Sequence, residues 1–265
     1  MTLIGVLISR VNVGIELFFT NLIYAPIAYV FIALSGLTVI KILQILQDAS
    51  NTGRLNLKQA LALFGAFFLV GIILTVVNVV LHVLNVIVIV YIIIIGVLWV
   101  LMGLLAYNNI IKSELIFVSI VSLVFTLGIF YGALLNTLII PVSIYLAFIT
   151  ATFLQSAREM IKSYDKKDRG GGFITINDGK EREKILKVSL LFQALSSIFL
   201  VMILFSNIAY PVLYFFVMLI SLIFISFAII ITLKSMREKR DYLRTSWLLK
   251  YGILFELIAF LVVGS

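Results

Sequence analysis

Long, uninterrupted apolar blocks constrain this chain more than any other feature of its sequence. Residues 60–80 and 86–106 each supply about the 20 residues that a helix needs to cross a ~30 Å hydrocarbon core. The blocks do not alternate apolar and polar residues, which excludes the strands of a membrane β-barrel. With 63% hydrophobic and 12% charged residues, the composition also excludes a soluble globular domain. The sequence therefore predicts an all-α, polytopic integral membrane protein.

The pattern predicts about nine transmembrane helices in a single transmembrane domain over residues 1–265. No tandem repeat or second domain interrupts it. Polar loops on the inner face are expected at 48–57, 107–113, 158–184 and 234–245. The predicted helices lie at about 11–26, 28–47, 58–80, 84–106, 114–136, 138–157, 185–206, 209–233 and 246–263.

The distribution of the 20 Lys and Arg residues predicts the orientation of the chain. On this map Arg10 precedes the first helix, the others lie in or beside every second connection, and the remaining connections hold none. Because cytoplasmic loops retain Lys and Arg, we expect a cytoplasmic N-terminus, an external C-terminus and a location in the cell membrane. The net charge of +8 then reflects topology and attraction to anionic lipids rather than nucleic-acid binding.

Five short motifs follow one another in order along the chain. They read Ser-Arg-Val-Asn at 9–12, Gly-Arg-Leu-Asn-Leu-Lys-Gln-Ala at 53–60, Tyr-Asn-Asn-Ile-Ile-Lys at 107–112, Ala-Arg-Glu-Met-Ile-Lys at 157–162 and Asp-Arg-Gly-Gly-Gly-Phe-Ile-Thr-Ile at 168–176. Their order and their places on the predicted loops resemble the UbiA family of intramembrane prenyltransferases. The resemblance implies a UbiA-like helical bundle.

The same resemblance implies a magnesium site. In that family, carboxylates on the second and sixth connections hold Mg²⁺ ions, which bind the pyrophosphate of an allylic isoprenoid. The matching positions here are Asp48, Asp165 and Asp168, too few acids for two ions. The chain also has no cysteine, which excludes thiol chemistry and iron–sulfur clusters. We therefore predict no cofactor for a non-catalytic protein, and Mg²⁺ if the protein is catalytic.

The basic half of the family's site is better preserved than the acidic half. Lys112, Arg158 and Lys162, with Tyr107 added by the resemblance, are candidates for binding a phosphate group without metal. If 158–168 continues the sixth predicted helix, Arg158, Lys162 and Asp165 stack on one face. The second and sixth connections are expected to meet over one cavity, with Asp48 nearby. The alternative remains that these cations are ordinary charges of inner loops.

Three ionisable residues, Glu16, Lys41 and Glu256, fall within predicted spans, where charges are costly and face the bundle interior. If the first two helices are antiparallel, Glu16 and Lys41 lie at similar depth and are expected to form an ion pair. Two structural explanations remain open. In the first, the pair serves only to fix the register of the two helices; in the second, Lys41 instead extends its ammonium group toward the inner membrane interface. Glu256 has no evident partner. Protonation, a cavity lining and a subunit interface remain open for it.

Three functions are compatible with these observations. The preferred hypothesis is a non-catalytic relative of the prenyltransferases that acts as a membrane-complex subunit, a scaffold or a lipid- or isoprenoid-binding protein. The alternative is a divergent prenyltransferase that transfers an isoprenoid to a quinone, haem or ether-lipid precursor. An unrelated transporter is disfavoured because no coupling-ion site is evident. The expected partners are membrane lipids or an isoprenoid and other membrane subunits, with no nucleic acid.

Overall fold

The structure is a computed structural model, and it describes residues 1–9, 15–47, 56–82, 87–107, 114–137, 139–168, 179–238 and 242–263. Throughout these residues, the regular elements are helices. Helices satisfy their own backbone hydrogen bonds, as a chain in lipid must. The chain divides into two compact units, described separately: unit 1 is Met1–Phe117 with Leu123–Ile140, and unit 2 is Val118–Ser122 with Pro141–Ser265.

Unit 1 is built on a long helix, α2, that packs along α3 and also contacts α4. The start of α3 is fixed by a reciprocal cap, in which Asn56 N donates to Gln59 Oε1 at 3.1 Å and Gln59 N donates to Asn56 Oδ1 at 2.8 Å. α5 contributes residues to both units. The helices are α1 (Thr2–Ile8), α2 (Ile15–Gln47), α3 (Leu57–His82), α4 (Ile87–Tyr107), α5 (Glu114–Thr126) and α6 (Gly128–Asn136).

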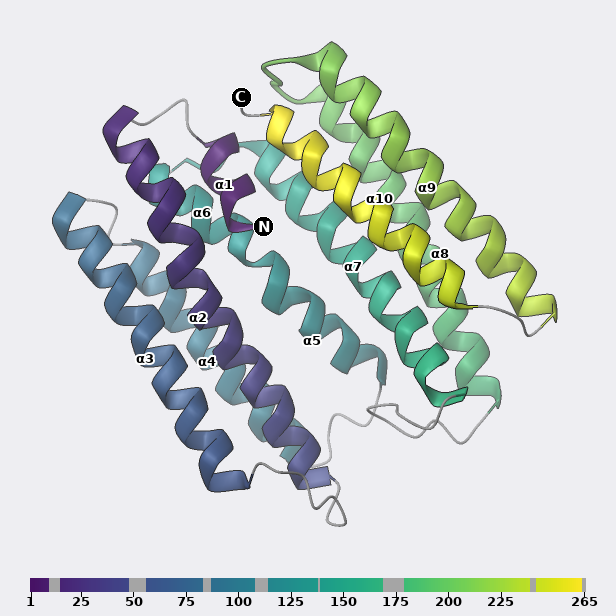
Figure 1. The fold of residues 1–265 in the computed structure, drawn as a ribbon, viewed down its shortest axis with the longest axis horizontal. Helices are drawn as coiled ribbons and strands as arrows, with labels where there is room; N and C mark the ends of the chain where they lie inside the picture. Colours follow the sequence, from purple (N-terminus) through teal and green to yellow (C-terminus); the bar gives the residue numbers. More distant parts are fainter. Residues whose placement is uncertain are drawn as a thin grey trace. The chain divides into compact units, whose positions relative to one another are not determined.

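Helix α2 corrects the predicted topology. The sequence predicted two spans separated near residue 27, whereas Ile15–Gln47 is one helix of 33 residues with Pro26 inside it, drawn as a continuous coil in Figure 1. Proline is tolerated within membrane helices because neighbouring groups satisfy the freed carbonyl. At 1.5 Å per residue, α2 is about 50 Å long. The predicted antiparallel pair of first helices is therefore wrong.

The short helix α1 packs against α6 through three glycines. A Cβ on Gly132 would overlap the carbonyl oxygen of Thr2, and one on Gly5 would overlap that of Ile129. A Cβ on Gly128 would come within 2.8 Å of Thr2 Oγ1. Small residues at these positions let two helix backbones approach closely, as is common in membrane helix pairs.

A chain of polar side chains ties four helices of unit 1 together. Asn78 Nδ2 donates to Asn21 Oδ1 at 3.1 Å, and Asn21 Nδ2 donates to Asn136 Oδ1 at 2.7 Å. Asn136 Nδ2 in turn donates to Val6 O at 2.8 Å and to Ser9 Oγ at 3.0 Å. Asn21 and Asn78 are almost fully buried. The network therefore links α3, α2 and α6 to the short helix α1.

Unit 2 contains four long helices. α7 packs against α8 and α10, and α9 packs against the same two helices. Residues 158–168 and 179–184 were predicted as loop, but they belong to α7 and α8, because Arg, Glu, Met and Lys favour helix beyond the apolar span. The elements are α7 (Val142–Asp168), α8 (Gly179–Met202), a 3₁₀ turn (Ile203–Phe205), α9 (Pro211–Glu238) and α10 (Tyr242–Val263).

Helices of both units carry large apolar side chains on their exposed surfaces. Val80, Phe227 and Ile230 expose 69%, 55% and 58% of their surface, which suits contact with lipid rather than water. Among the described residues, 5 helices are long and apolar enough to cross a membrane: Phe18–Val39, Leu57–Val80, Glu183–Phe205, Pro211–Lys234 and Arg244–Val263. Shorter apolar helices cover Ile87–Leu101 and Ile120–Asn136. The chain is a multi-pass membrane protein.

Candidate anion site at the charged end of α7

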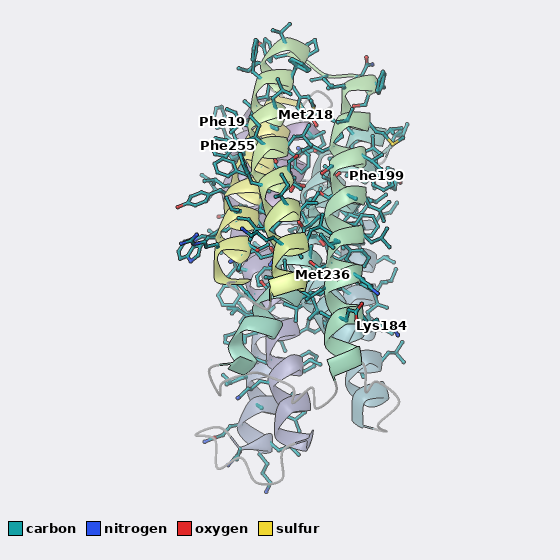
Figure 2. The ribbon with its side chains drawn as sticks, turned by 90° about the vertical axis from the view of Figure 1, so that its right-hand side faces the viewer. Phe19, Lys184, Phe199, Met218, Met236 and Phe255 are labelled. Carbon is teal, nitrogen blue, oxygen red and sulfur yellow. The ribbon has the colours of Figure 1, made fainter. Side chains whose placement is uncertain are left out.

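The last turns of α7 differ from the rest of that helix because they carry charged side chains. We call residues 155–168 the charged end of α7. The helix passes through Arg158 and Lys162 without a break and ends at Asp168. Figure 2 shows a similar change along α8, where Lys184 lies near one end and Phe199 lies farther along the helix. The candidate site therefore stands on regular helix rather than on loop.

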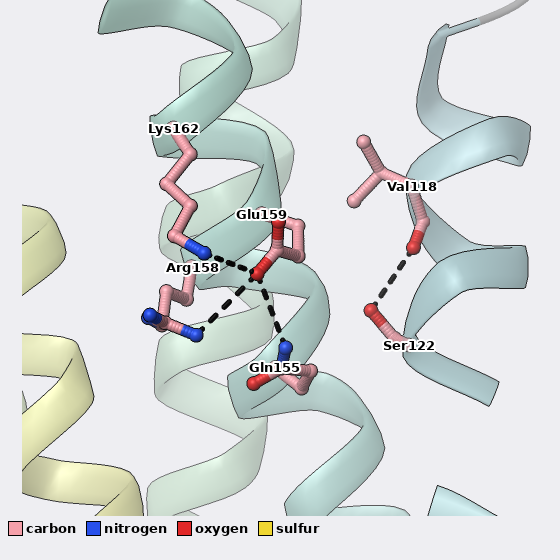
Figure 3. A network of polar contacts seen from close by, with 6 residues as sticks. All are labelled: Val118, Ser122, Gln155, Arg158, Glu159 and Lys162. Atoms are coloured by element: carbon pink, nitrogen blue, oxygen red, sulfur yellow. Dashed lines mark hydrogen bonds and ion pairs between the residues drawn. The ribbon is translucent and has the colours of Figure 1, made fainter. Parts of the chain in front are cut away.

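One carboxylate oxygen organises the charged end of α7 (Figure 3). Glu159 Oε1 accepts hydrogen bonds from Lys162 Nζ at 2.8 Å, Gln155 Nε2 at 3.1 Å and Arg158 Nη1 at 3.4 Å. Lys162 and Gln155 lie three residues after and four residues before Glu159, so all three occupy one side of the helix. The acid thus holds two cationic side chains close together.

The charged side chains of Arg158, Glu159 and Lys162 are partly buried. The side chains of Arg158 and Glu159 are 19% and 20% exposed, and that of Lys162 is 35% exposed. Arg158 Nε is buried and has no hydrogen-bond acceptor, although a buried donor without a partner is costly. The guanidinium therefore keeps an unused donor beside a partly open surface.

The backbone beneath this cluster is firmly packed. Met160 and Ile161 are 1% and 0% exposed. Ser189 Oγ on α8 donates to Ala157 O at 3.1 Å, which fixes α8 against the same turn of α7. Side chains on a rigid helix hold a binding geometry better than side chains on a loop.

The structure brings two of the predicted phosphate-binding residues together, Arg158 and Lys162. Lys112 and Asp48 lie outside the described residues, so the predicted shared cavity stays a prediction. Tyr107 ends α4, and Asp165 and Asp168 belong to α7, but their side chains lie outside the description. Sequence reasoning did not assign a role to Glu159, although its spacing to Gln155 and Lys162 was the available signal.

The predicted Glu16–Lys41 ion pair is wrong. Both residues belong to the single helix α2, on which their positions are about 37 Å apart at 1.5 Å per residue. The prediction ended one span at residue 26 and began the next at residue 28, whereas the helix continues through Pro26. Lys41 is exposed. Glu256, in contrast, is 0% exposed within unit 2.

The described groups do not suit two magnesium ions. Mg²⁺ requires several oxygen ligands in octahedral geometry, whereas Glu159 Oε1 is already occupied by three donors. The charges of Arg158 and Lys162 beside it would repel a divalent cation. The described side chains Gln155, Arg158 and Lys162 offer donors, which suit an anion better than a metal ion.

Comparisons with known proteins support the fold. No protein-family model and no curated protein matches the chain. A solved structure of a digeranylgeranylglyceryl phosphate synthase in membranes is similar, with a TM-score of 0.67 and 18% sequence identity. The similarity covers 99% of this chain and 91% of that chain. A UbiA-like arrangement of membrane helices is therefore supported.

Proposed function

We propose that this protein binds a phosphate-bearing membrane lipid, either a phospholipid or an isoprenoid phosphate, at the charged end of α7 without magnesium. The observation that carries the proposal is the buried, unpartnered Arg158 Nε beside a lysine held by the same carboxylate. Guanidinium and ammonium groups are the side chains that bind phosphate best. The similarity in fold to a prenyl-lipid synthase agrees with a ligand drawn from the membrane.

The Glu159 carboxylate prepares the two cations for this role. An isolated arginine or lysine loses up to about 2 kcal/mol of side-chain entropy when it is fixed. Here Arg158 and Lys162 are already directed toward one point by Glu159 Oε1. Their summed charge with Glu159 is about one positive unit, which complements a singly charged phosphodiester better than a multiply charged pyrophosphate.

Loss of magnesium-dependent prenyl transfer is part of the same proposal. A pyrophosphate leaving group requires concentrated metal charge, and the candidate acids Asp48, Asp165 and Asp168 number too few for two ions. Cations that bind substrate and transition state equally do not accelerate the chemical step. The protein is then a lipid-binding relative of the prenyltransferases, and its role as a subunit of a membrane complex stays a prediction.

Phosphate binding should depend on Arg158 and should not depend on metal. Losing one charge-assisted hydrogen bond costs about 1.5–3 kcal/mol, so Arg158→Ala should weaken binding by about 10- to 100-fold. The measurement is native mass spectrometry of the purified protein with phosphatidylglycerol and with a non-cleavable geranylgeranyl pyrophosphate analogue, each with Mg²⁺ and with a chelator. The two ligands distinguish a phospholipid from an isoprenoid phosphate.

The matched control is Lys187→Ala on α8. Lys187 also pairs with a glutamate, Glu183, at 2.6 Å, but its side chain is 64% exposed. Its removal should leave binding of both ligands unchanged. Equal loss in the two variants would show that net charge, not the charged end of α7, binds the lipid and would contradict the proposal.

A divergent prenyltransferase is the second candidate, and the similar synthase structure favours it. Release of pyrophosphate from geranylgeranyl pyrophosphate, measured with quinone, porphyrin and glycerol-phosphate acceptors, separates the two. Our proposal predicts no Mg²⁺-dependent release. Turnover that is abolished by Asp48→Ala or Asp168→Ala would establish the enzyme instead.

The continuous helix α2 changes the proposed orientation. If α2 crosses once, the chain before it lies on the outer side, and all of the 20 Lys and Arg residues except Arg10 still lie at inner ends or connections. The positive-inside rule then favours an external N-terminus and an external C-terminus. This proposal replaces the cytoplasmic N-terminus expected from the sequence.

Accessibility to membrane-impermeant reagents should show this orientation. The chain has no native cysteine, so single cysteines report cleanly. Asn207→Cys, exposed in the connection before α9, and a tag placed before Met1 should both be modified from outside intact cells. Asn56→Cys, exposed before α3, should react only after permeabilisation. Protection of the N-terminal tag in intact cells would contradict the external N-terminus and would favour the two spans predicted at 11–26 and 28–47.

A further inference from the structure

A pocket of about 700 Å³ lies at the end of unit 2 that is opposite to the charged end of α7. The helices α7 and α8 pack side by side and run in opposite directions (Figure 1). The ring of Phe153 on α7 stacks against that of Phe199 on α8, with centroids 6.0 Å apart, so the beginning of α7 meets the end of α8. We call the space between them the Ser143 pocket, and it is lined by Pro141, Val142, Ser143, Leu146, Met202, Phe205, Ser206 and Asn207.

The α7 wall of the Ser143 pocket presents hydrogen-bond donors. The first N–H groups of a helix have no acceptor within that helix. Ile144 N is used, because it donates to Pro141 O at 3.0 Å, which leaves the N–H of Ser143 open. Ser143 is only 4% exposed, and its hydroxyl makes no hydrogen bond with the described residues. A buried hydroxyl without a partner, on the wall of a pocket, indicates a ligand.

The α8 wall of the Ser143 pocket presents acceptors. The 3₁₀ turn that follows α8 ends where Ser206 N and Ser206 Oγ both donate to Ile203 O, at 2.9 and 2.7 Å. The carbonyl groups of Phe205 and Ser206 lie beyond the last bond of this turn, where a helix leaves its acceptors unsatisfied. Asn207 is exposed, and its side-chain amide adds a further acceptor.

The two walls carry opposite partial charges without any ionised side chain. A helix has about half a positive charge at its first turn and about half a negative charge at its last turn. None of the residues that line the Ser143 pocket is acidic or basic. A simple anion or cation would therefore be attracted by one wall and repelled by the other. A ligand that carries both charges and no net charge complements both walls.

The rim of the Ser143 pocket is apolar and lies at the edge of a membrane span. Phe205, Val142 and Met202 expose 87%, 66% and 45% of their surface. The apolar span Glu183–Phe205 ends at this rim, which is the depth at which the headgroups of a bilayer begin. Large exposed apolar side chains beside a polar pocket suit the acyl chains of a lipid rather than a ligand from water.

Hydrogen bonds hold the α8 wall in place without a ligand. Tyr214 Oη on α9 donates to Leu200 O at 2.7 Å. Ala209 N, in the connection after Asn207, donates to Val263 O at the end of α10 at 3.2 Å. A pocket whose walls are already fixed loses little conformational freedom when it binds.

We propose that the Ser143 pocket binds the headgroup of phosphatidylethanolamine, a phospholipid without net charge. The phosphate accepts hydrogen bonds from Ser143 Oγ and Ser143 N at the positive end of α7. The ammonium group donates to the carbonyl end of α8 and to Asn207 Oδ1, and the acyl chains lie against the exposed Val142 and Phe205. This site is separate from the charged end of α7 and does not depend on the role proposed there.

Other phospholipids lack part of this complementarity. Phosphatidylcholine has the same net charge, but its quaternary ammonium group has no N–H to donate to the acceptors beside Asn207. Phosphatidylglycerol has the phosphate without a positive group, so the negative end of α8 repels its charge. The Ser143 pocket should therefore prefer phosphatidylethanolamine to both lipids.

Native mass spectrometry of the purified protein with these three lipids measures the preference. Ser143→Ala should weaken the binding of phosphatidylethanolamine by about tenfold or more, because a hydrogen bond to a charged group is lost. Its effect on phosphatidylglycerol, which the cations Arg158 and Lys162 attract, should be much smaller. The matched control is Ser226→Ala, since Ser226 on α9 is exposed and lies outside the pocket. Equal affinities for phosphatidylethanolamine in the two variants would overturn the proposal.

Hydrogen–deuterium exchange locates the lipid in the wild-type protein and needs no variant. Peptides that cover 139–146 and 203–209 should exchange more slowly in nanodiscs that contain phosphatidylethanolamine than in nanodiscs of phosphatidylcholine with the same acyl chains. A peptide that covers 155–168, at the other end of α7, should show no such difference and reports any general effect of the bilayer. Equal exchange of the two pocket segments in both nanodiscs would also overturn the proposal.

Discussion

Replacing Gly132 with valine is expected to detach α1 from α6 and to destabilise unit 1 by about 3 kcal/mol or more. A Cβ at this position would overlap Thr2 O and would approach Val6 N to 2.9 Å. These are backbone atoms, which cannot move aside as the end of a flexible side chain can. The two helices must therefore separate, and the hydrogen bonds of Asn136 to Val6 O and Ser9 Oγ are lost with them.

Unfolding in mixed micelles, followed by circular dichroism, measures this loss. Gly5→Val should behave like Gly132→Val, because a Cβ there would come within 2.9 Å of Ala133 N. Gly65→Ala is the matched control, since nothing lies within 4 Å of its added Cβ. We expect that control to be neutral or slightly stabilising, because alanine favours helix more than glycine. Wild-type stability in Gly132→Val would show that α1 does not pack closely on α6.

The second large effect is expected from Asn136→Leu. Leucine removes the acceptor of Asn21 Nδ2 and the donor to Val6 O and Ser9 Oγ. Each buried group left unpaired costs about 1–3 kcal/mol, so the loss should amount to several kcal/mol. The penalty is high because the amide of Asn21, which is 0% exposed, is left without its acceptor.

A double-mutant cycle with Asn21→Leu separates the network from the individual side chains. If Asn21 and Asn136 interact as described, the double variant should lose less stability than the two single variants together, with a coupling of about 0.5–3 kcal/mol. Thr137→Val serves as the control, since the hydroxyl that it removes bonds with the nearby Ile139 at 3.0 and 3.1 Å in the exposed segment after α6, outside the asparagine network. Strict additivity at Asn21 and Asn136 would contradict a shared network.

The later helices could be predicted closely from hydropathy. The predicted spans at 58–80 and 209–233 correspond to α3, Leu57–His82, and α9, Pro211–Glu238. A bilayer leaves an apolar segment of this length with one stable option, a helix. Local signals also mark the starts, where Asn56 caps α3 and Pro211 occupies a first helical position.

Pro26 shows why the first helix was predicted incorrectly. Proline breaks helices in water, and two apolar stretches around it have the length of two spans. In lipid the cost of a proline is small compared with the cost of an exposed turn, so the helix continues. The packing of α2 along α3 supports this one long helix, and such packing is not encoded in a local window.

The sequence by itself determined the chemistry that was available: apolar helices long enough to span a membrane, basic residues gathered at alternate connections, and the cations Arg158 and Lys162 on adjacent turns. Only the tertiary structure decided how those groups are used. In the folded chain Arg158 Nε is buried without an acceptor, Glu159 holds both cations, and Glu256 is enclosed within unit 2. Composition and spacing act along one chain segment, whereas burial and hydrogen-bond satisfaction depend on which helices become neighbours.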